Sequence, residues 1–241
     1  METLSHAGKK LLTKIGIMPG STKTGSEDKV ERQLEKARRA WLNEMKDLKD
    51  DLGVVILPEK APELTARHLS RCEVVQNREY ILQRIPKGGV GVEVGVQEGM
   101  FSRLILDICQ TRELHLIDLD LRRYGIAEKF QTEIERGLVK LHEGDSSRLI
   151  AGFPDNYFDF IYIDADHSYP GVKKDIKAAR TKVKAGGLLI FNDYTFWSPG
   201  ECINYGVIQA VNELCVEDDW EFRYFALAGY MYCDVALSKI V

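Results

Sequence analysis

The chain has 241 residues, of which 44% are hydrophobic, and these values are typical of one soluble α/β domain with an appendage. The formal net charge is −4 and the basic residues are scattered, so the sequence does not predict a surface that binds nucleic acid. No apolar run reaches the roughly 20 residues of a membrane span, and the five cysteines form no CxxC pair, so we expect reduced thiols and a cytoplasmic protein.

Residues 1–87 have mixed charge and helical periodicity, and we expect a helical appendage, either a lid over an active site or a solvated structural cap. The polar run 28–51 has apolar residues at helical spacing and predicts one helix with an exposed face. A short apolar run follows at 54–57. Residues 64–82 return to the helical period and predict a further helix.

Residues 88–241 alternate between strand-like and helix-like segments, which predicts a parallel sheet with right-handed crossovers. Two final strand-like runs, 220–228 and 231–240, are separated by only two residues, which is typical of a hairpin. The predicted fold class is α/β: a Rossmann-like, doubly wound, seven-stranded sheet, mostly parallel with a C-terminal antiparallel hairpin, plus N-terminal helices. The other expected strands are 90–95, 113–118, 138–142, 157–164 and 187–192, and the expected helices are 99–110, 126–136, 146–152, 170–184 and 201–216.

The segment 89–102 is typical of a strand, a tight glycine turn and a helix whose N-terminus points backbone amides at a ligand. Glu93 ends the strand, where its carboxylate can accept from a cationic or amide group. Gly95 and Gly99 are four residues apart, which differs from the GxGxxG spacing of dinucleotide-binding folds. The alternative interpretation is a glycine turn that serves only the packing of strand on helix.

Acidic residues also follow the next two expected strands. Asp118 ends the strand 113–118, where a carboxylate can accept both ribose hydroxyls of an adenosine ligand. Asp145 and Ser146 follow the strand 138–142, where they can reach an adenine amino group. Asp145 can equally cap the helix that follows, and the two roles are compatible.

Residues 88–241 resemble a class I S-adenosylmethionine-dependent methyltransferase in their Glu-x-Gly-x-x-x-Gly turn, in the acidic end of the second strand and in the terminal hairpin. The resemblance implies that S-adenosylmethionine is the cofactor. It implies that Gly95 and Gly99 line the methionine moiety, that Ser102 lies near its carboxylate, that Asp118 holds the ribose, and that Asp145 and Ser146 border the adenine.

Polar side chains also leave the ends of two later strands. Asp164 and His167 follow the strand 157–164, at the carboxyl end where open α/β sheets bind their ligands. Asn192 and Asp193 end the next strand. The oxygens of Asp164, Asn192 and Asp193 suit Mg²⁺ that keeps several waters, and the sequence therefore predicts a divalent metal site. Alternatively, Asp193 holds the turn without metal.

This arrangement resembles the cation-dependent O-methyltransferases of the catechol and caffeoyl-coenzyme A type. Asp164 matches their first acid, and His167, three residues on, falls at the position of their basic lysine. The Asn192-Asp193 pair has the reverse of their order. The segments around both strand ends are more similar to bacterial O-methyltransferases of the macrocin type, which act on sugar hydroxyls and natural products.

The sequence therefore predicts an S-adenosylmethionine-dependent O-methyltransferase for a hydroxyl of a small molecule. Mg²⁺ would lower the pKa of the acceptor hydroxyl and His167 would remove its proton. The alternatives are a metal-independent enzyme with His167 as base, an NAD-dependent oxidoreductase, disfavoured by the missing third glycine, and a non-catalytic cofactor-binding scaffold. We expect a small hydroxylated acceptor, neither nucleic acid nor membrane as partner, and surfaces compatible with a homodimer.

Overall fold

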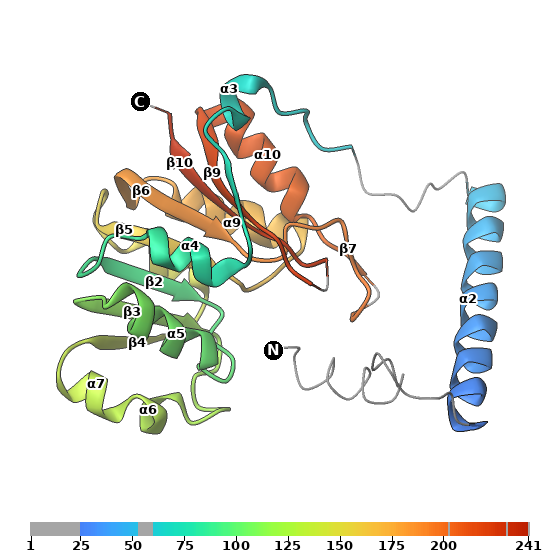
Figure 1. The fold of residues 1–241 in the computed structure, drawn as a ribbon, viewed down its shortest axis with the longest axis horizontal. Helices are drawn as coiled ribbons and strands as arrows, with labels where there is room; N and C mark the ends of the chain where they lie inside the picture. The colour runs from blue at the N-terminus through green and yellow to red at the C-terminus, as the bar shows by residue number, and fades with distance from the viewer. Residues whose placement is uncertain (1–24, 53–59, 202, 230, 241) are drawn as a thin grey trace. The chain divides into compact units, whose positions relative to one another are not determined.

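The structure is a computed structural model that describes residues 25–52, 60–201, 203–229 and 231–240 (Figure 1). The chain divides into two compact units, residues 1–58 with 198–203, and residues 59–197 with 204–241. In the first unit, α2 (Gly25–Leu52) confirms the helix predicted at 28–51. It is a polar helix, supported by an ion pair one turn apart in which Arg39 Nε lies 2.9 Å from Glu35 Oε1. The apolar run 54–57 lies outside the described residues.

The second unit is built on an eight-stranded sheet in the order β1-β9-β10-β6-β5-β2-β3-β4. The central strands run parallel, whereas β10 runs antiparallel to both β6 and β9. The predicted α/β class, with its mostly parallel sheet and terminal antiparallel hairpin, is confirmed, but the sheet has eight strands instead of the predicted seven because β1 joins its edge. The strands are β1 (Glu73–Val75), β2 (Val90–Val94), β3 (Glu113–Asp118), β4 (Val139–Glu143), β5 (Phe158–Ile163), β6 (Val183–Phe191), β9 (Trp220–Ala226) and β10 (Asp234–Lys239).

The order of the strands reverses at β2. From β2 the chain continues outward through β3 to β4, and it then returns to place β5 and β6 on the other side of β2. Open α/β sheets bind ligands at the carboxyl ends of the strands beside such a reversal. The topology therefore predicts a ligand site at the carboxyl ends of β2 and β5.

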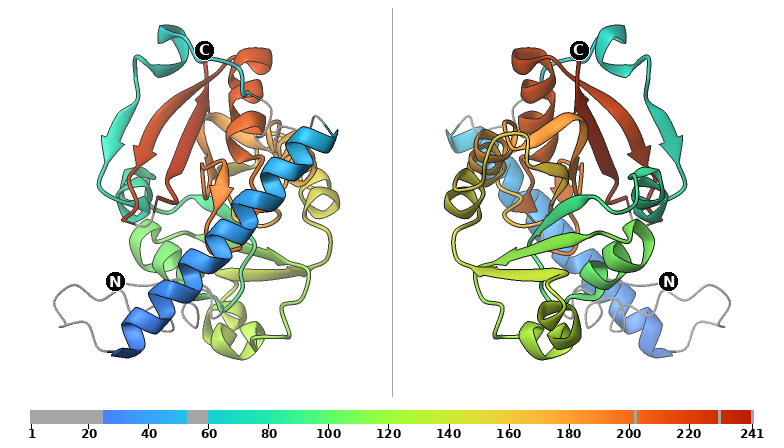
Figure 2. Two further views of the ribbon diagram at one scale, coloured as in Figure 1. Left: turned by 90° about the vertical axis from the view of Figure 1, so that its right-hand side faces the viewer. Right: turned by 90° about the vertical axis from the view of Figure 1, so that its left-hand side faces the viewer.

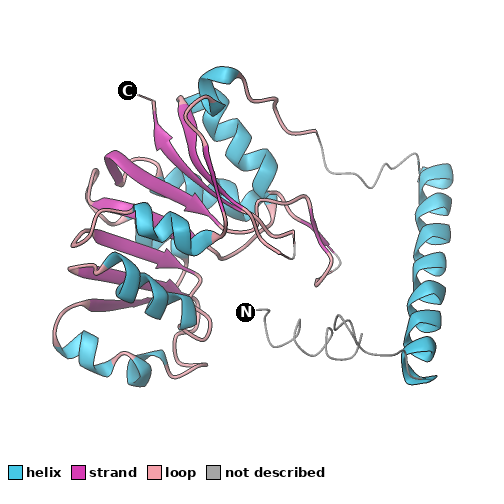
Figure 3. Ribbon diagram, in the orientation of Figure 1, coloured by secondary structure: helices cyan, strands magenta, loops and turns pink. Residues whose placement is uncertain are grey.

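Helices cover both faces of the sheet (Figures 2 and 3). Side chains alternate along each strand, so Ile161 and Ile163 of β5 join the core on the side of α9 and α10, while Phe160 and Tyr162 join the core on the side of α4 and α5. The helices of this unit are α3 (Ala66–Leu69), α4 (Arg78–Arg84), α5 (Met100–Cys109), α6 (Ile126–Lys129), α7 (Gln131–Glu135), α8 (Ser146–Ala151), α9 (Tyr169–Ala179) and α10 (Val207–Asp218).

The prediction of one helix over residues 64–82 is wrong. The segment forms α3, then β1, which pairs in parallel with the outer side of β9, and then α4. The Asn77 side chain starts α4 anew by accepting hydrogen bonds from the backbone N–H groups of Glu79 and Tyr80, at 3.0 and 3.3 Å. Residues 60–87 belong to the same compact unit as the sheet.

Two smaller differences concern loops. The helix expected at 201–216 begins only at Val207, after the two-residue strands β7 (Trp197–Ser198) and β8 (Ile203–Asn204). The hairpin connection spans 227–233 instead of two residues. No helix in the described ranges is long and apolar enough to cross a membrane. The cysteines that the structure describes, Cys72, Cys109, Cys215 and Cys233, are free thiols.

Candidate active site

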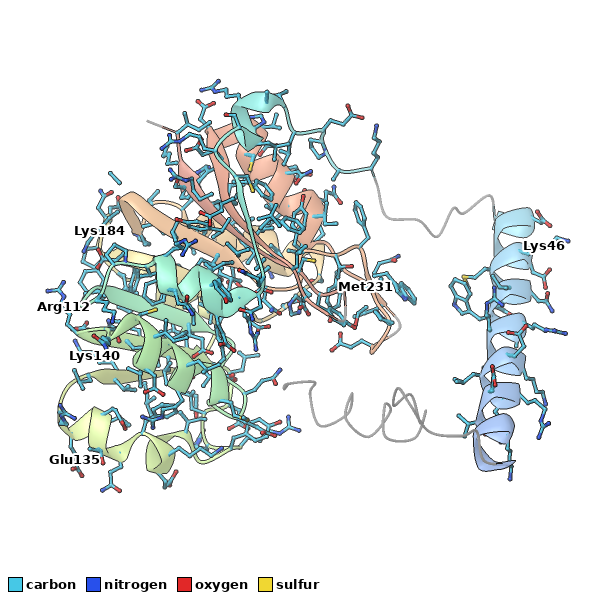
Figure 4. All side chains as sticks on the ribbon, in the orientation of Figure 1. Lys46, Arg112, Glu135, Lys140, Lys184 and Met231 are labelled. Carbon is cyan, nitrogen blue, oxygen red and sulfur yellow. The ribbon has the colours of Figure 1, made fainter. Side chains whose placement is uncertain are left out.

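The carboxyl ends of β2, β3, β5 and β6 lie along one edge of the sheet. Arg112, Lys140 and Lys184, near the starts of β3, β4 and β6, lie toward the opposite edge, whereas Met231 in the β9–β10 connection lies on the carboxyl side (Figure 4). Arg112, Lys140 and Lys184 therefore lie away from the edge where the predicted site residues gather.

The glycine turn after β2 requires glycine at both predicted positions. Gly95 has a φ of +88°, and a Cβ there would lie 1.8 Å from the backbone oxygen of Asp164. Gly99 has a φ of +76°, and a Cβ there would lie 2.8 Å from the ring of Phe130. Left-handed backbone and close approach both exclude other residues. The turn thus packs directly against the backbone of Asp164, the residue that follows β5.

Glu93 and Ser102 form a buried pair beneath this turn. Their exposed fractions are 1% and 0%, and the Ser102 hydroxyl donates a hydrogen bond to Glu93 Oε2. Burial raises the pKa of the Glu93 carboxyl to about 8, and the hydrogen bond from Ser102 offsets only part of this rise. The carboxyl is therefore largely protonated at neutral pH, and it ties β2 to α5.

Asp118 closes the glycine turn from β3. Its Oδ2 accepts hydrogen bonds from the backbone N–H groups of Val96 and Gln97, at 2.8 and 3.1 Å. Its Oδ1 accepts from the N–H of Asp120 at 3.0 Å. Because a carboxylate offers about four acceptor positions, the same side chain can hold the turn and still accept a hydroxyl of a ligand.

Asp145 and Ser146 lie at the start of α8. Asp145 Oδ1 accepts from the backbone N–H of Arg148 at 3.0 Å and from the hydroxyl of Ser147 at 2.6 Å. The predicted capping role of Asp145 is therefore confirmed. The Ser146 hydroxyl donates to Asp175 Oδ1 at 2.6 Å, which ties α8 to α9.

His167 lies between two carboxylates at the ends of β5 and β6. Its Nε2 is 3.6 Å from Asp164 Oδ1 and 3.8 Å from Asp193 Oδ2. Its ring stacks on Tyr205, with the ring centroids 4.5 Å apart. Nε2 is buried and has no hydrogen-bond partner among the residues the structure describes. Burial raises the pKa of Asp164, and His167 and Arg78 offset part of this rise.

The side chain of Asn192, the third predicted metal ligand, donates hydrogen bonds to Asp234 and Tyr162. Its side chain is buried, and its Nδ2 donates to Asp234 Oδ1 at 3.1 Å and to the Tyr162 hydroxyl at 3.4 Å. Within the described ranges, no group of three or more His, Cys, Asp or Glu side chains is placed to hold a metal ion. Asp164 and Asp193 thus flank His167, while the amide nitrogen of Asn192 faces Asp234 and Tyr162.

Sequence reasoning missed two residues of this edge, Arg78 and Asp234. Arg78 begins α4, and its guanidinium carbon lies 4.2 Å from the centroid of the Phe101 ring. Asp234 begins β10 and is 3% exposed, and it accepts a hydrogen bond from the Tyr162 hydroxyl. Burial raises the pKa of Asp234 to about 6. The sequence signal for Asp234 is a carboxylate at the head of the apolar run Val235–Leu237, and Arg78 carries no comparable signal.

Comparison with known proteins agrees with this geometry. Residues 92–194 match the family model of a methyltransferase domain. No curated protein matches the chain. The match spans the glycine turn and both strand ends that hold Asp164 and Asp193. Residues 92–194 therefore match a methyltransferase domain, in agreement with the class that the sequence predicted.

Solved structures of similar fold are distant in sequence. A protein from Clostridium thermocellum provisionally described as an rRNA-methylase has a TM-score of 0.53 at 13% identity, over 69% of this chain and 99% of that one. An O-methyltransferase family protein from Burkholderia thailandensis has a TM-score of 0.52 at 12% identity, over 67% and 55%. The Bacillus subtilis tRNA methyltransferase TrmK has a TM-score of 0.50 at 12% identity, over 69% and 67%. This chain thus spans about half the length of the Burkholderia protein, and these likenesses show the fold alone.

Proposed function

We propose that this protein is an O-methyltransferase that transfers the methyl group of S-adenosylmethionine to a hydroxyl of a small molecule, with His167 as the general base. The observation that carries the proposal is the buried His167 Nε2, which lacks a hydrogen-bond partner in the described structure and lies between two carboxylates. An imidazole in this position can accept a proton, and the neighbouring carboxylates stabilise the imidazolium that results.

The residues of the carboxyl edge fit the proposed cofactor. The glycine turn at Gly95 and Gly99 leads into α5, whose first backbone N–H groups would face the ligand, and the Asp118 carboxylate keeps an acceptor position for a ribose hydroxyl. Glu93 and Ser102 would support the turn from beneath, and Asp145 with Ser146 would border the adenine. When bound, S-adenosylmethionine supplies an electrophilic methyl group on its sulfonium.

The chain's own residues then have a defined task. His167 Nε2 would take the proton of the acceptor hydroxyl, and the bound cofactor would supply the methyl group, with the electron pair of the broken carbon–sulfur bond left on sulfur. Alignment of the reacting atoms can contribute more to such a displacement than the roughly 10²- to 10⁴-fold effect of the base.

The sequence also predicted that Mg²⁺ assists the reaction, with Asp164, Asn192 and Asp193 as ligands. A metal would bind Oδ1 of Asn192, so the hydrogen bond that its Nδ2 donates to Asp234 is compatible with either form of the reaction. Turnover measured in EDTA and in added Mg²⁺ distinguishes the two forms: loss of turnover in EDTA is expected if Mg²⁺ assists, and equal rates are expected if His167 acts without metal.

The test is an acceptor screen with radiolabelled S-adenosylmethionine against sugars and hydroxylated natural products, followed by the His167→Ala variant. We expect turnover to fall about 10²- to 10⁴-fold, because the proton of the hydroxyl loses its acceptor, while cofactor affinity stays within a few-fold. Equal turnover in His167→Ala would contradict the role of the base, and labelling of RNA alone would contradict the small-molecule acceptor.

A further inference from the structure

Arg78 brings a cation to the glycine turn from outside the matched region 92–194. Its guanidinium stacks on Phe101, in the first turn of α5, the helix that begins after Gly99. Its Nη1 lies 3.5 Å from the hydroxyl of Tyr162 on β5. Arg78 is half-buried, so its guanidinium is fixed beside the start of α5 without being sealed from the edge of the sheet.

A carboxylate faces the same turn from β5. The backbone of Asp164 packs directly on Gly95, and its side chain is 26% exposed. Burial by itself lowers the pKa of the Arg78 guanidinium, but the nearby Tyr162, Asp234 and Asp164 more than offset this and raise it. A fixed cation and a fixed anion therefore flank the turn. An α-amino acid group, which has one carboxylate and one ammonium, is complementary to such a pair.

We propose that Arg78 binds the carboxylate of the cofactor's methionine moiety, with Asp164 facing its ammonium group. The proposal rests on the use of S-adenosylmethionine and is independent of the acceptor. The planar guanidinium matches a carboxylate with two parallel hydrogen bonds. The Ser102 hydroxyl, which the resemblance placed near this carboxylate, is fully buried and donates to Glu93.

Lys129 is a rival cation at the turn. Its Nζ donates to the backbone oxygen of Glu98 at 2.9 Å, and the residue is exposed. Arg84, at the other end of α4, pairs with Glu73 at 2.6 Å. Substitution of either residue by Gln provides a matched control, because it removes one positive charge from the same unit as Arg78.

The experiment is isothermal titration of S-adenosylmethionine and of its decarboxylated analogue, which lacks only the carboxylate. The full-length protein is compared with Arg78→Gln, Arg84→Gln and Lys129→Gln. We expect the wild type to prefer S-adenosylmethionine by about 10- to 100-fold, as for a charge-assisted pair. Arg78→Gln should abolish this preference by weakening S-adenosylmethionine alone, and both control variants should retain it.

Any one of three results would overturn the proposal: equal binding of the two ligands by the wild type, an unchanged preference for S-adenosylmethionine in Arg78→Gln, or loss of that preference in Lys129→Gln and not in Arg78→Gln. Absence of any binding of S-adenosylmethionine to the wild type is a different result, because it contradicts the cofactor itself. Circular dichroism and thermal unfolding check that each variant folds. If Arg78→Gln does not fold, Arg78→Lys, which keeps the charge and loses the paired donors, should show an intermediate preference, and an unchanged preference would contradict the role of Arg78.

Discussion

At the scale of single residues, the site depends on backbone that only glycine can adopt. We predict that Gly95→Ala destabilises the protein by about 1–3 kcal/mol or more and weakens the binding of S-adenosylhomocysteine, because its Cβ would meet the Asp164 carbonyl at 1.8 Å with φ at +88°. Thermal unfolding and isothermal titration measure the two effects.

Gly137→Ala is the matched control for this substitution. Gly137 also has a positive φ, +71°, but a Cβ there would have no neighbour within 4 Å. The control should therefore show only the backbone cost of about 1–2 kcal/mol and unchanged binding. Equal effects of the two substitutions would mean that the close approach of β2 and β5 does not matter.

At the scale of elements, the short helix α4 positions Arg78, and its first turn is held by Asn77. Asn77→Ala removes the acceptor for two backbone N–H groups, and we expect a loss of about 1 kcal/mol. Because Arg78 is the next residue, affinity for S-adenosylmethionine should fall as well. Chemical denaturation and titration test both effects.

Ser168 provides the comparison, because its side chain caps α9 by accepting from the N–H of Gly171 at 3.2 Å. Ser168→Ala should lower stability by a similar amount, about 1 kcal/mol, without the loss of cofactor affinity that Asn77→Ala shows. A fall in affinity of the same size in both variants would indicate a general loss of stability, and not a displaced Arg78.

At the scale of the whole molecule, the buried acid Glu93 makes folding depend on pH. Its pKa in the folded state, about 8, lies above the ordinary value of 4.5, so the folded protein binds the proton more tightly than the unfolded chain. The stability that this group contributes is present at low pH and is lost as pH rises through about 8. Relative to Glu93→Gln, the free energy of unfolding of the wild type should fall by up to about 1.4 kcal/mol per pH unit between pH 4.5 and about pH 8.

Denaturant unfolding of the two proteins at several pH values measures this difference. Glu98→Gln, which changes an exposed carboxylate of the same turn, is the charge-matched control. Parallel stability curves for the wild type and Glu93→Gln would show that Glu93 titrates normally in the folded protein.

The sequence alone determined the elements whose signals are local. Alternating apolar segments placed β2 to β6 within a few residues, and the glycine spacing located the turn at Gly95. The capping of α8 by Asp145 could also be predicted from the sequence, because the cap joins residues only three apart in the chain. In each case the interactions that produce the structure lie within one helix or one strand and its turn.

Only the tertiary structure decided which distant residues meet at the carboxyl edge. Asn192 stands in the chain beside Asp193, yet its amide donates to Asp234, 42 residues later. Residues 64–82 read as a helix because their periodicity does not reveal that Val74 pairs with Phe225 on the open side of β9. Arg78 likewise reaches Tyr162 across 84 residues. Such contacts follow from strand order and helix packing, which bring together side chains that no local pattern relates.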